Sequence, residues 1–385
     1  MENQFRIENG ILIKYDGPGG NVTIPDGIRA IGAGAFLNHE NLRSVVIPEG
    51  VEEISGDFFS ETPLGAFSGC MQLAVVKLPE SLSEIGCRAF YGCKSMRNIT
   101  LPAGLKKIGN RAFENCENLK NIIIPDGVSE IDYGVFMGCT ALREAAFPAG
   151  VTVMREYAFS GCVSLEKIDL PKGLKAIDFS AFQNCKNLRR IYIPDTVKEI
   201  GDYAFENCEN LISAMIDKNV EKIGENAFNG CKNLTIRTSS ESTAENYAQN
   251  HEIRVLTFEK LRDAAEDMRR KAYAPYSNFG VGAALECEDG TVYTGCNVEN
   301  ASYPAGICAE RNAVFHAVSE GQTKYARMVI IGSGDQPCVP CGICRQVIAE
   351  FSPDMEIICL GKNGGAKKFF MRDLLPESFG AGNLK

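Results

Sequence analysis

Apolar residues recur every 23 positions over the first two thirds of the chain. The repeating unit reads approximately IPxGVxxIGxxAFxxCxNLxxI, and nine units fit between residues 24 and 235. One interval is 31 residues long, and its eight extra residues fall within EISGDFFSETPLGAFSGC, residues 53–70. The proline of the unit marks the period: Pro25, Pro48, Pro79, Pro102, Pro125, Pro148, Pro171 and Pro194. A fixed period of this length indicates a solenoid.

Within one unit, the segment before the proline, such as NLKNIIIP, predicts a short strand. The following Gly-Val-x-x-Ile-Gly stretch predicts a turn and a second extended segment. One unit cannot cover its own Ile, Phe and Leu side chains, so neighbouring units must stack. The phenylalanine of the unit recurs at Phe36, Phe67, Phe90, Phe113, Phe136, Phe159, Phe182, Phe205 and Phe228.

This periodic segment resembles the BspA-like leucine-rich repeats over about 250 residues. GILIKYDGPGG, residues 10–20, resembles the lead-in that such solenoids often carry. SSESTAENYAQNHEIRV, residues 239–255, breaks the pattern and is polar, and we interpret it as a helical terminal cap. We therefore expect a leucine-rich-repeat solenoid over residues 1–255 and a second domain over residues 256–385.

Eight of the 16 cysteines occupy one position of the repeat, where the first unit has His39. They are Cys70, Cys93, Cys116, Cys139, Cys162, Cys185, Cys208 and Cys231. Stacked strands lie about 4.8 Å apart, which permits disulfide distances, but equivalent side chains point in parallel rather than at each other. We favour small buried side chains that fill the same space in each repeat over a metal or redox ladder.

The pattern changes after residue 256, where helical and strand-like segments alternate. Helices are predicted at FEKLRDAAEDMRRKAY and from ICAERNAVFHAV and CGICRQVIAEF, and strands at FGVGAALEC, TVYTGCNV, ARMVIIGSG and MEIICLG. Such alternation indicates an α/β layered domain. Both cysteine-containing motifs of this segment fall at helix starts.

Helix starts suit metal binding by cysteine, because free N–H groups and the helix dipole lower the pKa of a thiol there. Cys341 and Cys344 lie three residues apart on one helix face, and Cys308 begins the other helix. Three protein ligands leave tetrahedral zinc one open position, which is the catalytic pattern. Glu310, two residues after Cys308, is placed to carry a proton beside the metal.

CNVENASYPAGICAER followed by PCGICRQ resembles the zinc-dependent cytidine deaminases, over about residues 258–385. PYSNFGVGAAL upstream and LLPESFG near the end match as well. The family has a proline directly before the first cysteine of the pair, and Pro340 supplies it. The resemblance therefore implies one Zn²⁺ per chain on Cys308, Cys341 and Cys344, with Cys338 uninvolved.

The resemblance also implies roles around the metal. Glu310 would shuttle protons while water attacks C4 of cytidine or deoxycytidine and ammonia leaves. Asn297 and Glu299 would hydrogen-bond the ribose, and Phe279 would pack on the nucleoside. Loop capping by Asn297 and Glu299, and a structural or inert role for the cysteine pair, stay open as alternatives.

Family members of this short type are homotetramers with shared active sites, and Tyr303 and Phe379 match positions that reach into a neighbouring subunit. Phe279 and Phe379 could alternatively belong to the core. Three thiolates on a dication leave a net charge of −1, so a nearby cation is needed to keep a bound water acidic. Arg311, adjacent to Glu310, is the first candidate for this compensation, and Arg345 is the second.

Charge narrows the choice of partner. The chain has a formal net charge of −9, and residues 256–385 carry 14 Lys and Arg against 16 Asp and Glu. This balance argues against nucleic acid and anionic membranes as partners. The N-terminus lacks a signal-peptide pattern and no apolar run reaches the length of a membrane span, so we expect a cytoplasmic protein.

Two classes of function follow. In the first, the chain deaminates free cytidine and deoxycytidine for pyrimidine salvage, and the solenoid docks an unknown protein partner. In the second, the chain is mainly an interaction protein, and its deaminase domain is an assembly platform or acts on an unusual nucleoside-like substrate. The intact set of Cys308, Glu310, Cys341 and Cys344 favours the first class.

Overall fold

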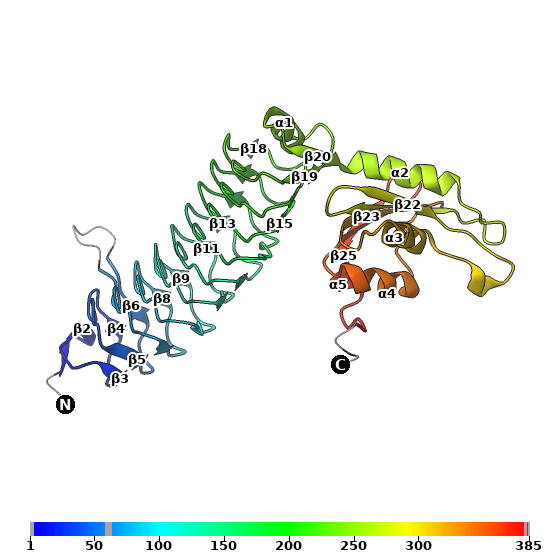
Figure 1. Ribbon diagram of the computed structural model, residues 1–385. Coiled ribbons are helices and arrows are strands. Elements are labelled where there is room, and N and C mark those ends of the chain that lie inside the picture. The colour runs from blue at the N-terminus through cyan, green and yellow to red at the C-terminus, as the bar shows by residue number, and fades with distance from the viewer. Residues whose placement is uncertain (1–3, 58–63, 381–382, 384–385) are drawn as a thin grey trace. The chain divides into compact units, whose positions relative to one another are not determined.

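The structure is a computed structural model that describes residues 4–57, 64–380 and 383. The chain divides into two compact units, Met1–Val255 and Leu256–Lys385 (Figure 1). Most of the predicted insertion in the longer repeat, residues 58–63, lies outside the described residues. No helix in the described ranges is both long and apolar enough to cross a bilayer.

The first unit is a solenoid whose turns contribute strands to two series of short sheets. One series begins with an antiparallel hairpin of β1 (Phe5–Glu8) and β2 (Ile11–Tyr15). It continues as parallel two-residue strands: β4 (Ala30–Ile31), β6 (Glu53–Ile54), β8 (Glu84–Ile85), β9 (Lys107–Ile108), β11 (Glu130–Ile131), β13 (Val153–Met154), β14 (Ala176–Ile177), β16 (Glu199–Ile200) and β18 (Lys222–Ile223). The two-residue strands are the Ile-Gly segments that the repeat predicts. Each pairs with the equivalent residues of the next repeat, as β11 does with β13.

The second series consists of the segments before the proline. Its strands are β3 (Gly20–Thr23), β5 (Leu42–Val46), β7 (Val75–Lys77), β10 (Asn121–Ile123), β12 (Glu144–Ala146), β15 (Arg190–Ile193), β17 (Ser213–Ile216), β19 (Thr235–Thr238) and β20 (Arg254–Thr257). The series is interrupted between β7 and β10, where residues 97–101 do not form a strand, and again between β12 and β15, where residues 167–170 do not. Figure 1 shows the successive turns from β2 to β19 stacked along this unit.

A continuous column of phenylalanine rings runs through the solenoid core. From Phe36 to Phe228, the rings of successive repeats stack with centroids 4.8–5.7 Å apart. All nine rings are buried. Each ring is covered mainly by the neighbouring turns, which confirms that one repeat cannot bury its own apolar side chains.

The eight repeat cysteines are buried packing residues, as we expected. Each thiol donates a hydrogen bond of 2.9–3.3 Å to the carbonyl oxygen of the phenylalanine in the preceding repeat. Burial raises the pKa of Cys70 to about 12, and the pKa of Cys116 also lies well above its usual range. A neutral thiol that fills space and satisfies one carbonyl is a poor metal ligand.

A short helix closes the C-terminal end of the repeats. This helix, α1 (Thr243–Asn250), begins at Ser242, whose side chain accepts a hydrogen bond from the Glu245 backbone. It packs against β18 and β19, and the Tyr247 ring meets the ring of Phe228 edge-on. The last phenylalanine of the column is thus covered by a helix instead of another repeat.

The second unit is a three-layered α/β domain, and the two-domain fold class is confirmed. Its five-stranded sheet has the order β22-β21-β23-β24-β25, and only the β23–β24 pair is parallel. Its elements are α2 (Phe258–Arg270), β21 (Val281–Cys287), β22 (Val292–Cys296), a 3-10 turn at Tyr303–Ala305, α3 (Ala309–Ser319), β23 (Tyr325–Gly332), α4 (Gly342–Phe351), β24 (Glu356–Leu360), β25 (Ala366–Phe370) and α5 (Met371–Leu374).

The helices divide between the two faces of this sheet. Apolar residues of α3, α4 and α5 share one core cluster with β21, whereas α2 packs in a second cluster on the opposite face. Glycines allow close packing, since a Cβ on Gly295 of β22 would lie 2.5 Å from the Ala309 backbone of α3. The sheet therefore holds the starts of α3 and α4 together on one side.

The ring column makes a prediction for stability. Replacing the buried Phe159 with Ala should cost about 3–5 kcal/mol, because the cavity removes packing on both neighbouring rings. Replacing Phe179 with Ala, whose partly exposed ring lies outside the column, should cost much less. Urea unfolding followed by circular dichroism gives the free energy of unfolding of both variants. Equal losses of stability in the two would contradict a special contribution of the ring column.

Candidate metal and substrate site

Three cysteine sulfurs meet where two helices begin. Cys308 is the N-cap of α3, Cys341 is the N-cap of α4, and Cys344 lies in the first turn of α4. The Cys308 and Cys341 sulfurs are 3.9 Å apart, and those of Cys341 and Cys344 are 3.6 Å apart. All three sulfurs lie within 4.8 Å of one another.

This geometry fits a zinc ion. Zinc binds thiolates at about 2.3 Å, so two sulfurs of a tetrahedral site lie about 3.8 Å apart. The Cys308–Cys341 and Cys341–Cys344 sulfur distances are close to that value. Cys338 is not part of this group, and burial raises the pKa of its thiol to about 11. The donors available are therefore three thiols with one coordination position left open.

The electrostatics of the cluster favour a thiolate at Cys308. Its pKa is lowered to about 5 by a hydrogen bond from the Cys344 thiol, with Arg311 and Cys341 also contributing. The pKa of Cys344 is raised correspondingly. One Arg311 nitrogen lies 3.8 Å from the Cys308 sulfur, and its buried Nε has no partner among the described residues. Arg311 thus sits where the excess negative charge of three thiolates needs compensation.

Arg345, the second candidate for charge compensation, has another role. Its Nε donates to the Pro340 carbonyl, and Nη1 donates to the Leu374 carbonyl. These bonds fix the chain just before Cys341 and connect α4 to the end of α5. The guanidinium supports the position of the cysteine pair through the backbone.

Glu310 lies in the first turn of α3 and is buried, with 4% of its surface exposed. Burial raises the pKa of its carboxyl group, and the nearby Cys308 thiolate acts in the same direction. A carboxyl group whose neutral and charged forms are closer in energy than in water is suited to accepting and returning a proton.

Asn297 and Glu299 hold a loop next to this cluster. The Asn297 side chain accepts from the Val281 backbone and donates to the Phe279 carbonyl. The Glu299 carboxylate accepts from the backbone N–H groups of Tyr276 and Ser277 and from the Ser277 hydroxyl. These bonds lower the pKa of Glu299. Both residues therefore cap the loop, which was the alternative left open, and a sugar-binding role would be additional.

The three predicted aromatic residues are exposed. Phe279 is 40% exposed, Phe379 is 56% exposed and Tyr303 is 80% exposed. The core alternative for Phe279 and Phe379 is therefore wrong. The Phe279 ring lies beside Gly332 and Gly334, at the end of β23.

Sequence reasoning missed three supports of the site. It did not predict β25 or α5, because both are short and carry no clear periodicity. It also assigned no role to Ser277, although PYSNFG places this turn-forming polar residue two positions before Phe279. The acceptor for Ser277, Glu299, is 22 residues away, and no local pattern could pair them.

Comparison with known proteins assigns both units. The family described as "BspA type Leucine rich repeat region (6 copies)" matches residues 18–65, 62–185 and 152–261. The family described as "Cytidine and deoxycytidylate deaminase zinc-binding region" matches residues 257–360. A leucine-rich repeat protein from Bacteroides ovatus is 31% identical with a TM-score of 0.53, over 59% of this chain and 58% of that one.

The second unit is similar to complete enzymes. A cytidine deaminase of Sporosarcina psychrophila is 43% identical over 127 residues, 33% of this chain and 93% of the relative. That of Halalkalibacterium halodurans is 44% identical over 117 residues, 30% of this chain and 89% of the relative. The solved cytidine deaminase of Burkholderia pseudomallei is 46% identical, covering 32% of this chain and all of that one, with a TM-score of 0.32.

The cysteine geometry predicts how metal content depends on each thiol. Elemental mass spectrometry of the purified protein should find one zinc ion per chain. A Cys341→Ala, Cys344→Ala double variant should lose it, because only one thiolate of the group remains. Cys338→Ala is the matched control and should keep its zinc, and loss of the metal in that variant instead would overturn the ligand assignment.

Proposed function

The chain belongs to the cytidine deaminase family through its second unit and to the BspA-type leucine-rich repeats through its first, and we propose that it deaminates free cytidine and deoxycytidine. The reaction consumes one water at C4 of the pyrimidine and releases ammonia, leaving uridine or deoxyuridine. The observation that carries this proposal is the meeting of Cys308, Cys341 and Cys344 beside the buried Glu310.

The residues around the cysteines have separate chemical roles. Cys308, Cys341 and Cys344 would hold the zinc ion, which when bound would supply a water acidic enough to be a nucleophile near neutral pH. Glu310 takes up the two protons of the attacking water in turn and delivers one to the pyrimidine ring and one to the departing amino group. Arg311 offsets the negative charge of the three thiolates.

The loop beside the cysteines forms the nucleoside site. Phe279 packs against the base, and its ring is held at the end of β23. Asn297 and Glu299 bind the sugar hydroxyls while they also fix the loop that carries Phe279. One pair of side chains then both shapes the site and recognises the substrate.

Exposed aromatic residues support an assembly with shared sites. Tyr303 is largely exposed, and its ring meets only the Tyr276 ring edge-on at 6.4 Å among the described ring contacts. Phe379 is exposed too, and its carbonyl accepts from the Gln346 side chain. We place both residues at the active site of a neighbouring subunit in a homotetramer formed by the second unit.

The cellular role follows from the substrate. Deamination of free nucleosides serves pyrimidine salvage, and we place the enzyme in the cytoplasm. All 16 cysteines lie within the described residues and are free thiols, which suits a reducing compartment. The repeats serve as a docking module for a partner protein.

The proton-transfer role predicts a large loss of turnover on a small change. Glu310→Gln should lower kcat by about 10²- to 10⁴-fold, because the amide cannot accept and return the proton. The rate at which the ultraviolet absorbance of cytidine and of deoxycytidine falls gives kcat for the variant and the wild type. Zinc content of the variant must match the wild type, and unchanged kcat at full zinc occupancy would remove Glu310 from the mechanism.

The shared-site arrangement predicts that assembly and activity are linked. Light scattering should give the mass of a tetramer, and Tyr303→Ala should raise KM at unchanged zinc content. Tyr273→Ala, also at an exposed tyrosine of the same unit, is the comparison. A monomeric mass with full activity would show that Tyr303 and Phe379 do not act on a neighbouring site.

A further inference from the structure

A row of cations lies on one face of the solenoid, five residues before Pro102, Pro125 and Pro148. Arg97, Lys120 and Arg143 occupy equivalent positions in three consecutive repeats and are exposed. Their backbones are directly joined, since Lys120 donates to the Arg97 carbonyl at 3.0 Å and Arg143 donates to the Lys120 carbonyl at 2.8 Å. Neighbouring strands lie about 4.8 Å apart, so the three side chains form a closely spaced basic row.

The basic row has no acidic partners of its own. None of its three cations forms an ion pair within the described part of the chain. At several other positions of the repeats, a cation pairs with an acid one turn away, as in Lys94–Glu117 at 2.7 Å and Lys186–Glu209 at 2.9 Å. Further such pairs are Lys107–Glu84, Arg155–Glu130, Lys198–Glu221 and Lys222–Glu199.

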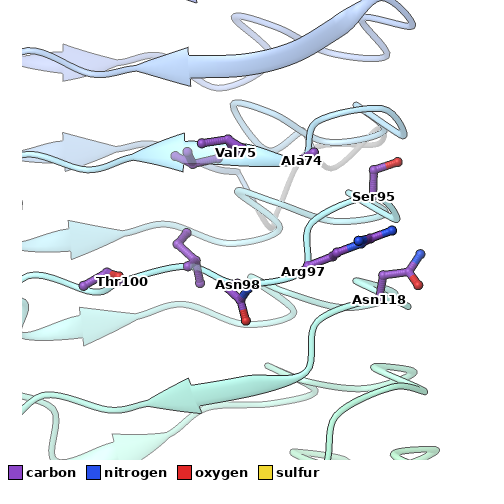
Figure 2. A pocket seen from close by; sticks show the side chains of 9 residues that line it. Ala74, Val75, Ser95, Arg97, Asn98, Thr100 and Asn118 are labelled. Atoms are coloured by element: carbon purple, nitrogen blue, oxygen red, sulfur yellow. The ribbon is translucent and has the colours of Figure 1, made fainter.

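The first cation of the row borders a surface hollow of about 610 Å³. The hollow lies where the second series of strands is interrupted, between β7 and residues 97–101. Figure 2 shows Arg97, Ser95 and Asn118 gathered at one end of it, with Asn98 and Thr100 further along. A guanidinium, amide groups and hydroxyls together offer several hydrogen-bond donors to an acidic group.

Exposed aliphatic side chains of the neighbouring strands flank the basic row. Val75 of β7 is 60% exposed and lines the hollow, and Ile123 of β10 is 73% exposed. One acid, Glu144, follows Arg143 on this face, and Glu166 ends the row in the next repeat. The surface thus combines a short run of positive charge with apolar side chains, on a chain whose net charge is −9.

We propose that the basic row binds an extended acidic segment of a partner protein, in which carboxylates alternate with aliphatic residues. Alternate side chains of an extended peptide lie about 7 Å apart on one face, and the long Arg and Lys side chains can bridge that spacing to the row. The acidic groups meet Arg97, Lys120 and Arg143, and the aliphatic residues cover Val75 and Ile123. This assignment rests on the docking role proposed above for the repeats and names its surface and partner.

Single-stranded nucleic acid fits this surface less well. Sequence-tolerant binding of single strands uses aromatic platforms on which bases stack, together with a basic groove. The exposed side chains that flank the basic row on its strands are aliphatic or small and polar, at Val75, Asn98, Thr100, Asn121 and Ile123. The chemistry of the face therefore matches a peptide.

Fluorescence anisotropy tests this binding with a fluorescein-labelled peptide of four Glu-Val repeats, on the full-length protein at low and at high salt. We expect saturable binding that weakens as salt rises. The triple variant Arg97→Glu, Lys120→Glu, Arg143→Glu should weaken binding by about tenfold or more, because three attractions become repulsions. A labelled peptide of Lys-Val repeats should not bind the wild type.

The matched control variant carries the same change of charge at other exposed positions of the repeats, Lys106→Glu, Lys175→Glu and Lys232→Glu. It should bind the acidic peptide nearly as the wild type does. Equal weakening in both variants, tighter binding of labelled oligothymidine, or no peptide binding at millimolar protein would each overturn the proposal. Cytidine turnover is measured on the same samples, so a protein that binds the peptide without turning over cytidine contradicts only the proposed catalytic function.

Discussion

The energy of a thiolate depends strongly on its surroundings, and this dependence separates the cysteines of the two units. In the solenoid, each repeat thiol is buried among apolar side chains and donates to a phenylalanine carbonyl, and at Cys116 this burial strongly favours the neutral form. At the start of α3, hydrogen bonds from Cys344 and Arg311 favour the charged form of Cys308 instead. One residue type therefore supplies a packing group in one unit and metal ligands in the other.

The sheet of the second unit brings the Cys308 thiolate together with the other residues of the site. Because α3 and α4 pack on the same face, the two helix starts meet and bring Cys308, Cys341 and Cys344 together. The same packing buries Glu310 and raises its pKa. The grouping of the thiols and the raised pKa of the carboxyl group thus depend on one arrangement of two helices on a sheet.

The sequence predicted what local spacing determines. The 23-residue period and the packing role of the repeat cysteines follow from residue types at fixed intervals, whereas the grouping of Cys308 with Cys341 and Cys344 came from their places at helix starts and from the resemblance to cytidine deaminases. The sequence could not show that Asn297 and Glu299 hold the loop around Ser277, because these bonds join segments that only the folded sheet brings together. It also could not show that Arg345 binds backbone carbonyls, since a guanidinium has the same charge wherever it points.

Whether a surface charge is paired is equally invisible before folding, and in this solenoid it is informative. Like charges at neighbouring positions of stacked turns repel and destabilise the stack, whereas opposite charges stabilise it slightly. The pairs Lys94–Glu117 and Lys186–Glu209 show that the repeat can place an acid one turn from a cation. At Arg97, Lys120 and Arg143 it places three cations in succession, so folding stability does not explain them. A surface that opposes the stability of its own fold is better explained by binding to something outside it.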